Sequence, residues 1–248
     1  MAKIKLDVLA VNVKGGSNSA PVRFIAWLRR RKAIGVPLVV GMTEADGLIV
    51  PYLQALTKFG WGGLHRGHGT HGAREVALQH LGRQFKVTSV EHHKLTDNVN
   101  PPGPDHDYAG DGQDRHCTMV RATVSKKVQV TVFSVHAPTS TRSGGDWTNT
   151  AGAREWRYHG RPKLASLIRE EIAAGRQVIV TGDFNEVLTR VSSGTGEWAK
   201  NLGLKVFVVD VMWIMVSHGP LKPVKRTILN RAPGCDHPHE IKLRLATR

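Results

Sequence analysis

The sequence is poor in cysteine and in acidic residues, and it has no long apolar run. Its 248 residues include two cysteines, Cys117 and Cys235, which are too few for a disulfide framework and too far apart for a paired-cysteine zinc site. No stretch approaches the ~20 apolar residues of a transmembrane helix. The N-terminus alternates polar with apolar residues where a signal peptide would be continuously apolar. We therefore expect an intracellular, cytoplasmic protein that does not act at a membrane.

Acidic residues are strongly outnumbered by basic ones. The chain has 20 Asp and Glu against 35 Lys and Arg, a formal net charge of +15. A positive excess of this size raises the local concentration of polyanions and speeds their encounter with the protein, so nucleic acid is the expected partner. The same charge could serve solubility alone, and it does not distinguish an enzyme from a binding protein.

The chain is long enough, and apolar enough at 40% hydrophobic residues, to form a substantial core. A single domain of this length buries roughly three quarters of the surface that its unfolded chain exposes. No internal repeat or low-complexity linker divides the sequence. We expect one domain over residues 1–248, present as a monomer.

Short β-branched runs alternate with helical patterns along the chain. We expect strands at 4–13, 36–42, 117–124, 128–135, 177–181, 205–211, 213–217 and 240–246, with β-structure also over 74–95. Helices are expected from about 20 to Gly35, from Pro51 to Gly60, and around 164–172, where Gly160 and Pro162 should break or kink any helix that enters from Arg154. This mixture indicates two sheets covered by helices, and the long polar loop at 96–116 is expected to wall a site.

Polar side chains follow several of these strands at their carboxyl ends. They are Asn12, Glu44, His136, Asp183 and Asn185, and the pair Asp236 and His237 precedes the last strand. A sheet gathers such positions at one edge, where carboxylates and amides offer the oxygen ligands that Mg²⁺ prefers. Each of these residues, taken alone, is also typical of an ordinary turn at the end of a strand. The order of all of them along the chain is the informative feature.

The motifs VNV, TEA, SVHAPT, TGDFNE and CDHP, in this order, resemble the endonuclease/exonuclease/phosphatase superfamily, the DNase I-like proteins. The resemblance extends over residues 4–245. It implies an α/β (α+β) fold: a four-layer α/β/β/α sandwich of two mixed β-sheets flanked by helices, with the site at one edge of the paired sheets.

The resemblance also implies a role for each of these residues. Glu44, with Asn12 beside it and Asp236 in or near the same shell, would hold Mg²⁺, with Mn²⁺ as an alternative. Asp183 would orient or deprotonate the attacking water. Asn185 would bind a phosphoryl oxygen as charge builds there.

Two histidines would face the scissile phosphate in this scheme. His237 would act as general acid/base or as a cationic clamp, and His136 would lie across the phosphate. Glu75 stands where these proteins carry a glutamate that orients the first histidine. Arg115 stands where they carry a phosphate-binding arginine.

One position departs from the family pattern. An aspartate usually precedes the final Asp-His pair on a strand and fixes the orientation of that histidine, but here Met212 occupies its place. Asp210 lies two residues earlier and would share a strand face with Met212, so it could take over the role; otherwise the strand is shifted in register. Without such a partner His237 would be poorly oriented, and activity would be low.

The expected function is Mg²⁺-dependent phosphodiester hydrolysis by a DNA endonuclease or exonuclease, since a polyanionic substrate accounts for both the motifs and the charge. One alternative keeps the chemistry but acts on a small or lipid phosphoester. Another is a nucleic-acid-binding protein that retains the fold but has weak catalysis because of Met212.

Overall fold

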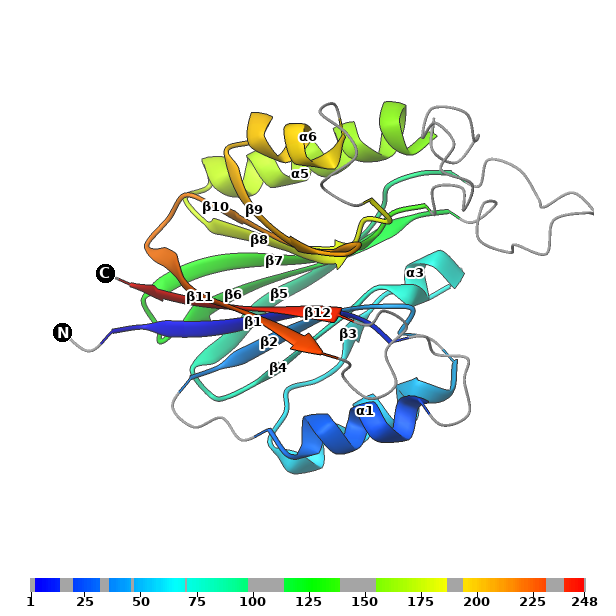
Figure 1. Ribbon diagram of the computed structural model, residues 1–248, viewed down its shortest axis with the longest axis vertical. Coiled ribbons are helices and arrows are strands. Elements are labelled where there is room, and N and C mark those ends of the chain that lie inside the picture. The colour runs from blue at the N-terminus through cyan, green and yellow to red at the C-terminus, as the bar shows by residue number, and fades with distance from the viewer. Residues whose placement is uncertain are drawn as a thin grey trace, which may run out of the picture.

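The computed structural model describes residues 3–13, 20–31, 36–45, 47–69, 71–97, 114–138, 155–186, 194–230 and 239–247. Within these residues two six-stranded sheets pack face to face, and helices lie on their outer sides (Figure 1). The first sheet has the order β11-β12-β1-β2-β4-β3 and the second the order β5-β6-β7-β8-β10-β9. Both are mixed, because β1 and β2 are parallel, β7 and β8 are parallel, and the other neighbours are antiparallel.

The strands of the first sheet are β1 (Lys5–Asn12), β2 (Leu38–Thr43), β3 (His65–Arg66), β4 (Ala77–Leu81), β11 (Leu221–Asn230) and β12 (His239–Thr247). Those of the second are β5 (Phe85–Lys94), β6 (His116–Val124), β7 (Val128–His136), β8 (Gln177–Asp183), β9 (Leu204–Val209) and β10 (Met212–Ser217). The helices are α1 (Ala20–Arg29), η1 (Gly47–Ile49), α2 (Val50–Ala55), η2 (Leu56–Phe59), α3 (His71–Glu75), η3 (Trp156–Gly160), α5 (Arg161–Ala173) and α6 (Thr195–Asn201).

Three apolar cores separate the four layers. The inner core lies between the sheets and contains alternate residues of their strands, such as Val8 of β1 and Val132 of β7. A second core joins the outer face of β1 and β2 to α1 and α2, and a third joins the outer face of β7, β8 and β10 to α5 and α6. The expected α/β/β/α sandwich of two mixed sheets flanked by helices is therefore confirmed (Figure 1). None of the described helices combines the length and apolar character needed to cross a bilayer.

Local sequence signals explain most of the elements. The helix expected after Pro51 runs as α2 and η2 and ends at Gly60, whose φ of +83° glycine adopts without strain. The expected disturbance near Gly160 and Pro162 appears as the π-helical turn η3, which continues directly into α5. Pro162 has no N–H to donate to the preceding turn, and the π-helical turn η3 lies just before it.

Three segments differ from the sequence-based expectation. Residues 74–95 are not continuous β-structure, because α3 ends at Glu75 and a turn separates β4 from β5. Helix α6 and strand β11 were not anticipated. Strand β11 contains Pro223 and many basic residues, which argue against a central strand, but it lies at the sheet edge with an irregularity between Pro223 and Lys225.

A buried carboxylate ties α5 to the second sheet. Glu171 of α5 accepts hydrogen bonds from Arg121 Nη2 at 2.8 Å and from Arg176 Nη2 at 3.1 Å, and Arg121 also pairs with Glu91. These cations, with the hydroxyl of Thr131, lower the pKa of Glu171 to about 2 despite the opposing effect of burial.

Replacing Glu171 with Gln should lower the free energy of unfolding at pH 7 by about 2 to 3 kcal/mol, because charge-assisted hydrogen bonds are lost from a buried site. The folded-state pKa lies below the unfolded value, so the stabilisation is complete above about pH 4.5 and is lost as the pH falls toward 2. Urea denaturation at several pH values should show the wild type and the variant converging in acid. Glu170→Gln, at the neighbouring exposed position, is the matched control. A pH-independent difference would contradict the assignment.

Candidate active site

Both parallel strand pairs end at the same edge of the sandwich. In the first sheet Asn12 ends β1 and Glu44 follows β2, and in the second His136 ends β7 and Asp183 ends β8. His136 and Asp183 are register partners, as are Asn12 and Thr43, the residue before Glu44. Parallel pairing therefore aligns the strand ends within each sheet.

Small and hydroxylic residues bring the two sheets together near this edge. A Cβ atom added to Gly41 of β2 would lie 1.8 Å from Thr181 Oγ1 of β8, so only glycine fits there. The Ser134 hydroxyl of β7 donates a 2.9 Å hydrogen bond to the carbonyl oxygen of Met42 in β2. These contacts place the end of β2 directly against the ends of β7 and β8.

Asn12 links the two sheets at this edge. Its Nδ2 donates to Glu44 Oε1 at 2.8 Å and to Asp183 Oδ2 at 3.0 Å. Asn12 and Asp183 are each 1% exposed, whereas Glu44 is partly exposed. Asn12 thus contacts two side chains that lie 32 and 171 residues away from it in the sequence.

The oxygens at this position suit a hard divalent cation. Glu44 and Asn12 offer carboxylate and amide oxygens, the ligand type that Mg²⁺ prefers. Within the described residues, His, Cys, Asp and Glu side chains alone form no group of three that could hold a metal ion. A cation here would therefore depend on Glu44 and Asn12 together with a further ligand. The predicted one, Asp236, lies outside the described residues.

A second cluster holds His136 in a defined orientation. Glu75 Oε2 lies 3.2 Å from His136 Nδ1 and accepts a 3.2 Å hydrogen bond from Arg115 Nη1. All three side chains are buried. The carboxylate places the Nδ1 proton toward itself, and His136 Nε2 is buried with no hydrogen-bond partner among the described residues. That nitrogen is available to an oxygen of a bound ligand.

This cluster contains the contact expected between Glu75 and the first histidine. Glu75 ends α3, and Arg115 precedes β6, where its backbone N–H donates to Thr96 Oγ1 at 2.9 Å. Arg115 reaches Glu75 itself, so its observed contact supports the carboxylate that orients His136. Its contact with a phosphate stays a prediction.

The turn after β8 places Asn185 beside Asp183. The Asn185 backbone N–H donates to Asp183 Oδ1 at 2.8 Å, and its Nδ2 donates to the carbonyl oxygen of Ala137 at 2.8 Å. Asn185 has a φ of +50°, a left-handed conformation that asparagine tolerates better than most residues. The turn therefore fixes both the carboxylate and the amide of the GDFN motif.

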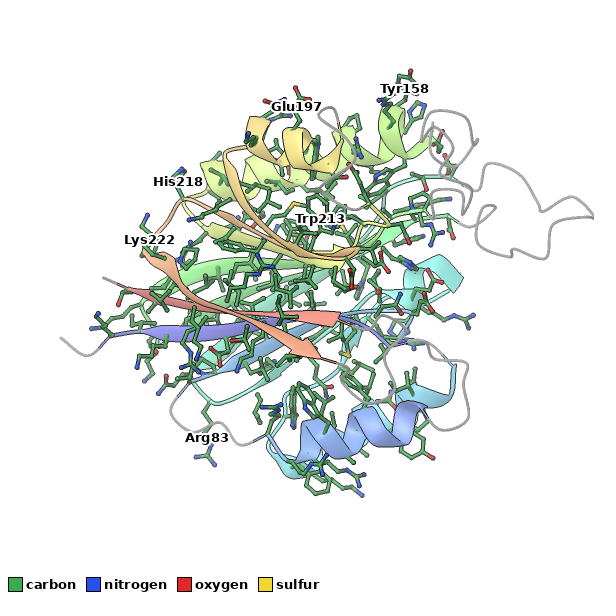
Figure 2. All side chains as sticks on the ribbon, viewed as in Figure 1. Arg83, Tyr158, Glu197, Trp213, His218 and Lys222 are labelled. Carbon is green, nitrogen blue, oxygen red and sulfur yellow. The ribbon has the colours of Figure 1, made fainter. Side chains whose placement is uncertain are left out.

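Glu186, the next residue, is a support that the sequence did not reveal. Its Oε2 accepts from Arg161 Nη2 at 3.2 Å and its Oε1 from the Thr195 backbone N–H at 3.0 Å. Trp213, which lies in the core beneath α5 and α6, donates its indole N–H to the Glu186 carbonyl oxygen at 2.8 Å (Figure 2). These partners come from α5, α6 and β10, and no local motif connects them.

Asp210 does not share a strand face with Met212, so that part of the prediction is wrong. It lies exposed in the two-residue turn between β9 and β10, with a φ of +51°, while Met212 is buried in β10 and pairs with Asp183. The short turn, not the strand, determines where Asp210 lies. His237, which Asp210 would orient, falls outside the described residues, as does Asp236.

Comparison with known proteins identifies this architecture. The chain matches no family model and no curated protein. Solved structures do match it: TDP2 from Caenorhabditis elegans has a TM-score of 0.65 at 16% identity, over 98% of this chain and 74% of that one. An endonuclease/exonuclease/phosphatase family protein from Bacteroides thetaiotaomicron has a TM-score of 0.65 at 14% identity, over 100% of both chains. D. rerio TDP2 complexed with single strand DNA product has 0.60 at 13%, over 100% of both chains.

The protein has the DNase I-like fold. The resemblance inferred from the ordered motifs is thus confirmed at the level of the fold. In this fold the candidate site lies where two parallel strand pairs end, one pair in each sheet.

Replacing Gly41 with Ala should destabilise the sandwich by about 1 to 3 kcal/mol, because the new methyl group overlaps Thr181. Thr181→Gly in the same chain should recover part of that loss, making the double variant more stable than the two single changes predict. Urea denaturation measures the coupling. Gly63→Ala is the control, since its Cβ would meet no atom closer than 3.9 Å. A Gly41→Ala protein as stable as the wild type would contradict close sheet contact.

Proposed function

We propose that this protein is a Mg²⁺-dependent phosphodiesterase that hydrolyses nucleic acid, with DNA as its preferred substrate. It acts as a monomer, either as an endonuclease or as an exonuclease. The observation that carries the proposal is the junction at Asn12, whose amide holds Glu44 and Asp183 together beside an oriented histidine. Two carboxylates, two amides and an imidazole at one sheet edge suit hydrolysis of a phosphate ester, which needs charge neutralisation, a base and an acid.

Glu44 and Asn12, with Asp236 as the expected third group, would hold the cation. When bound, Mg²⁺ neutralises charge on the phosphate and on the departing oxygen. Glu44 is partly exposed, so a cation can approach its carboxylate from solvent.

Asp183 serves as the base for the attacking water in this proposal. The Asn185 N–H and the Asn12 amide hold its two oxygens, so its orientation is set before substrate arrives. Water attacks phosphorus, its proton passes to Asp183, the bond from phosphorus to the leaving oxygen breaks, and that oxygen takes a proton from His237.

Asn185 and His136 act on the non-bridging oxygens. The Asn185 turn holds its side-chain amide next to Asp183, where Nδ2 donates to the Ala137 carbonyl oxygen, and this amide is the group that would stabilise charge on a phosphoryl oxygen in the transition state. His136 Nε2, when protonated, donates to a phosphoryl oxygen, while Glu75 holds the opposite side of the ring. Arg115 reinforces this contact through Glu75.

Charge favours nucleic acid over a small phosphoester. A net charge of +15 is far more than one phosphate group requires, but it suits a polyanion contacted at many phosphates. The similarly folded D. rerio TDP2 with its single strand DNA product supports the same choice.

Purified protein should nick or degrade supercoiled plasmid or a labelled oligonucleotide in Mg²⁺, and EDTA should stop the reaction. Asp183→Asn should lower the rate by about 100-fold or more, since a positioned base contributes on that scale. Glu197→Gln, at an exposed carboxylate on α6, is the control and should retain the wild-type rate (Figure 2). Gel electrophoresis and fluorescence report the cleavage.

Two other outcomes would contradict the proposal. Hydrolysis of a soluble phosphomonoester with the plasmid intact would indicate a small-phosphoester enzyme. Tight binding of DNA without any cleavage in Mg²⁺ or Mn²⁺ would indicate a binding protein that retains the fold.

A further inference from the structure

A cavity of about 600 Å³ lies at the end of the first sheet that is remote from the candidate active site. Val36 and Pro37, which precede β2, and residues 81–84 at the end of β4 form part of its wall, together with Phe59. The active-site residue Glu44 follows the other end of β2. Figure 2 shows Arg83 projecting at the end of the molecule opposite α3. We call this space the arginine cavity, because Arg29, Arg31 and Arg83 line it.

The three arginines have no acidic partner within the described residues. No Asp or Glu occurs in the sequence between Asp7 and Glu44 or between Glu75 and Glu91, the stretches that supply Arg29, Arg31 and Arg83. Their positive charge is therefore not balanced by nearby residues of their own segments.

Asp7 is the acidic residue whose backbone bonds to the cavity wall, and its carboxylate already pairs with other cations. The Asp7 backbone N–H bonds the Pro37 carbonyl oxygen, but its carboxylate is held by Arg244 at 2.7 Å and by Lys242 at 2.7 Å. Asp7 thus cannot neutralise the arginine cavity without breaking its own pairs. Burial lowers the pKa of Arg31, and the positive charge of the neighbouring Arg30 lowers it further.

Aromatic side chains hold two of the guanidinium groups in place. The Arg29 guanidinium lies over the Phe59 ring at 4.8 Å, and that of Arg31 lies over Trp27 at 4.0 Å. Phe59 remains 50% exposed. Guanidinium groups suit phosphate oxygens, and a half-exposed aromatic side chain can contact a nucleobase. The combination matches the two repeating parts of a nucleic-acid strand.

We propose that the arginine cavity is a second contact site for nucleic acid, binding backbone phosphates of the strand whose scissile bond lies at the catalytic edge. This deepens the proposed function and rests on it for the identity of the strand. The six residues of β2 separate the two sites, a span of about 20 Å at ~3.3 Å per residue. A substrate of several nucleotides would reach both sites, while a dinucleotide would reach only one.

The test is the affinity for a fluorescein-labelled 20-nucleotide single strand, measured by anisotropy in EDTA over a range of salt. Arg29→Gln, Arg31→Gln and Arg83→Gln combined should raise Kd about tenfold or more. The slope of log affinity against log salt should fall by about 2, since each single-strand phosphate contact contributes roughly 0.7. Arg83→Glu alone should also raise Kd. Because Arg83 lies at an exposed turn position, this single variant tests the proposal even if the triple variant misfolds.

The matched control removes three exposed cations from the opposite side of the sandwich: Arg169→Gln, Lys200→Gln and Lys205→Gln. If the cavity variant and this control variant bind the strand with the same affinity and the same salt slope, the proposal is overturned. Hydrolysis of a dinucleotide phosphodiester in Mg²⁺ is measured separately and should be unchanged in the cavity variant. Absence of hydrolysis in every protein would refute the proposed activity but leave the binding comparison valid.

Discussion

The close contact between the two sheets at Gly41 and Thr181 is the constraint on which the site depends. Glu44 belongs to one sheet and Asp183 to the other, and both must reach the single amide of Asn12. Large apolar side chains at this depth would hold the sheets near the usual spacing of ~10 Å. A glycine facing a threonine, together with the bond from Ser134 to Met42, permits a closer approach at the catalytic edge.

Among the residues that the structure describes at this edge, the buried carboxylates of Glu75 and Glu186 each have partners that fix their direction. Glu75 is held between His136 and Arg115, and Glu186 between Arg161 and Thr195. A buried carboxylate without such partners would be strongly disfavoured, and its pairing leaves little freedom to reorient. The site is therefore organised in advance of ligand binding, the condition under which dipoles and charges stabilise a transition state most effectively. The arginine cavity is the opposite case, because none of its three arginines pairs with a carboxylate in the part of the chain that the structure describes.

Much of the fold was predictable because it rests on local patterns. The runs at β1, β2, β7 and β8 are apolar and β-branched, which indicated strands, and the polar motifs that follow them resembled a known superfamily, which implied the sandwich and its edge. The hydrogen bonds of Glu186 with Arg161, Thr195 and Trp213 were not predictable, since these partners lie on helices and a strand that are distant from it in the sequence. Strand β11 was hidden by its proline and its basic residues, and Asp210 was misplaced because a tight turn, which periodicity does not reveal, ends β9 before it.

The central claim is that these dispersed groups form one cation-dependent site at the Asn12 junction. Anomalous diffraction from crystals soaked in Mn²⁺ tests it most directly, because the cation and its ligands are located independently of turnover. The account predicts an anomalous peak in coordination with a Glu44 carboxylate oxygen, absent from Glu44→Gln crystals of the same form. A Mn²⁺ ion bound only elsewhere, or no peak at this edge at saturating Mn²⁺, would contradict it.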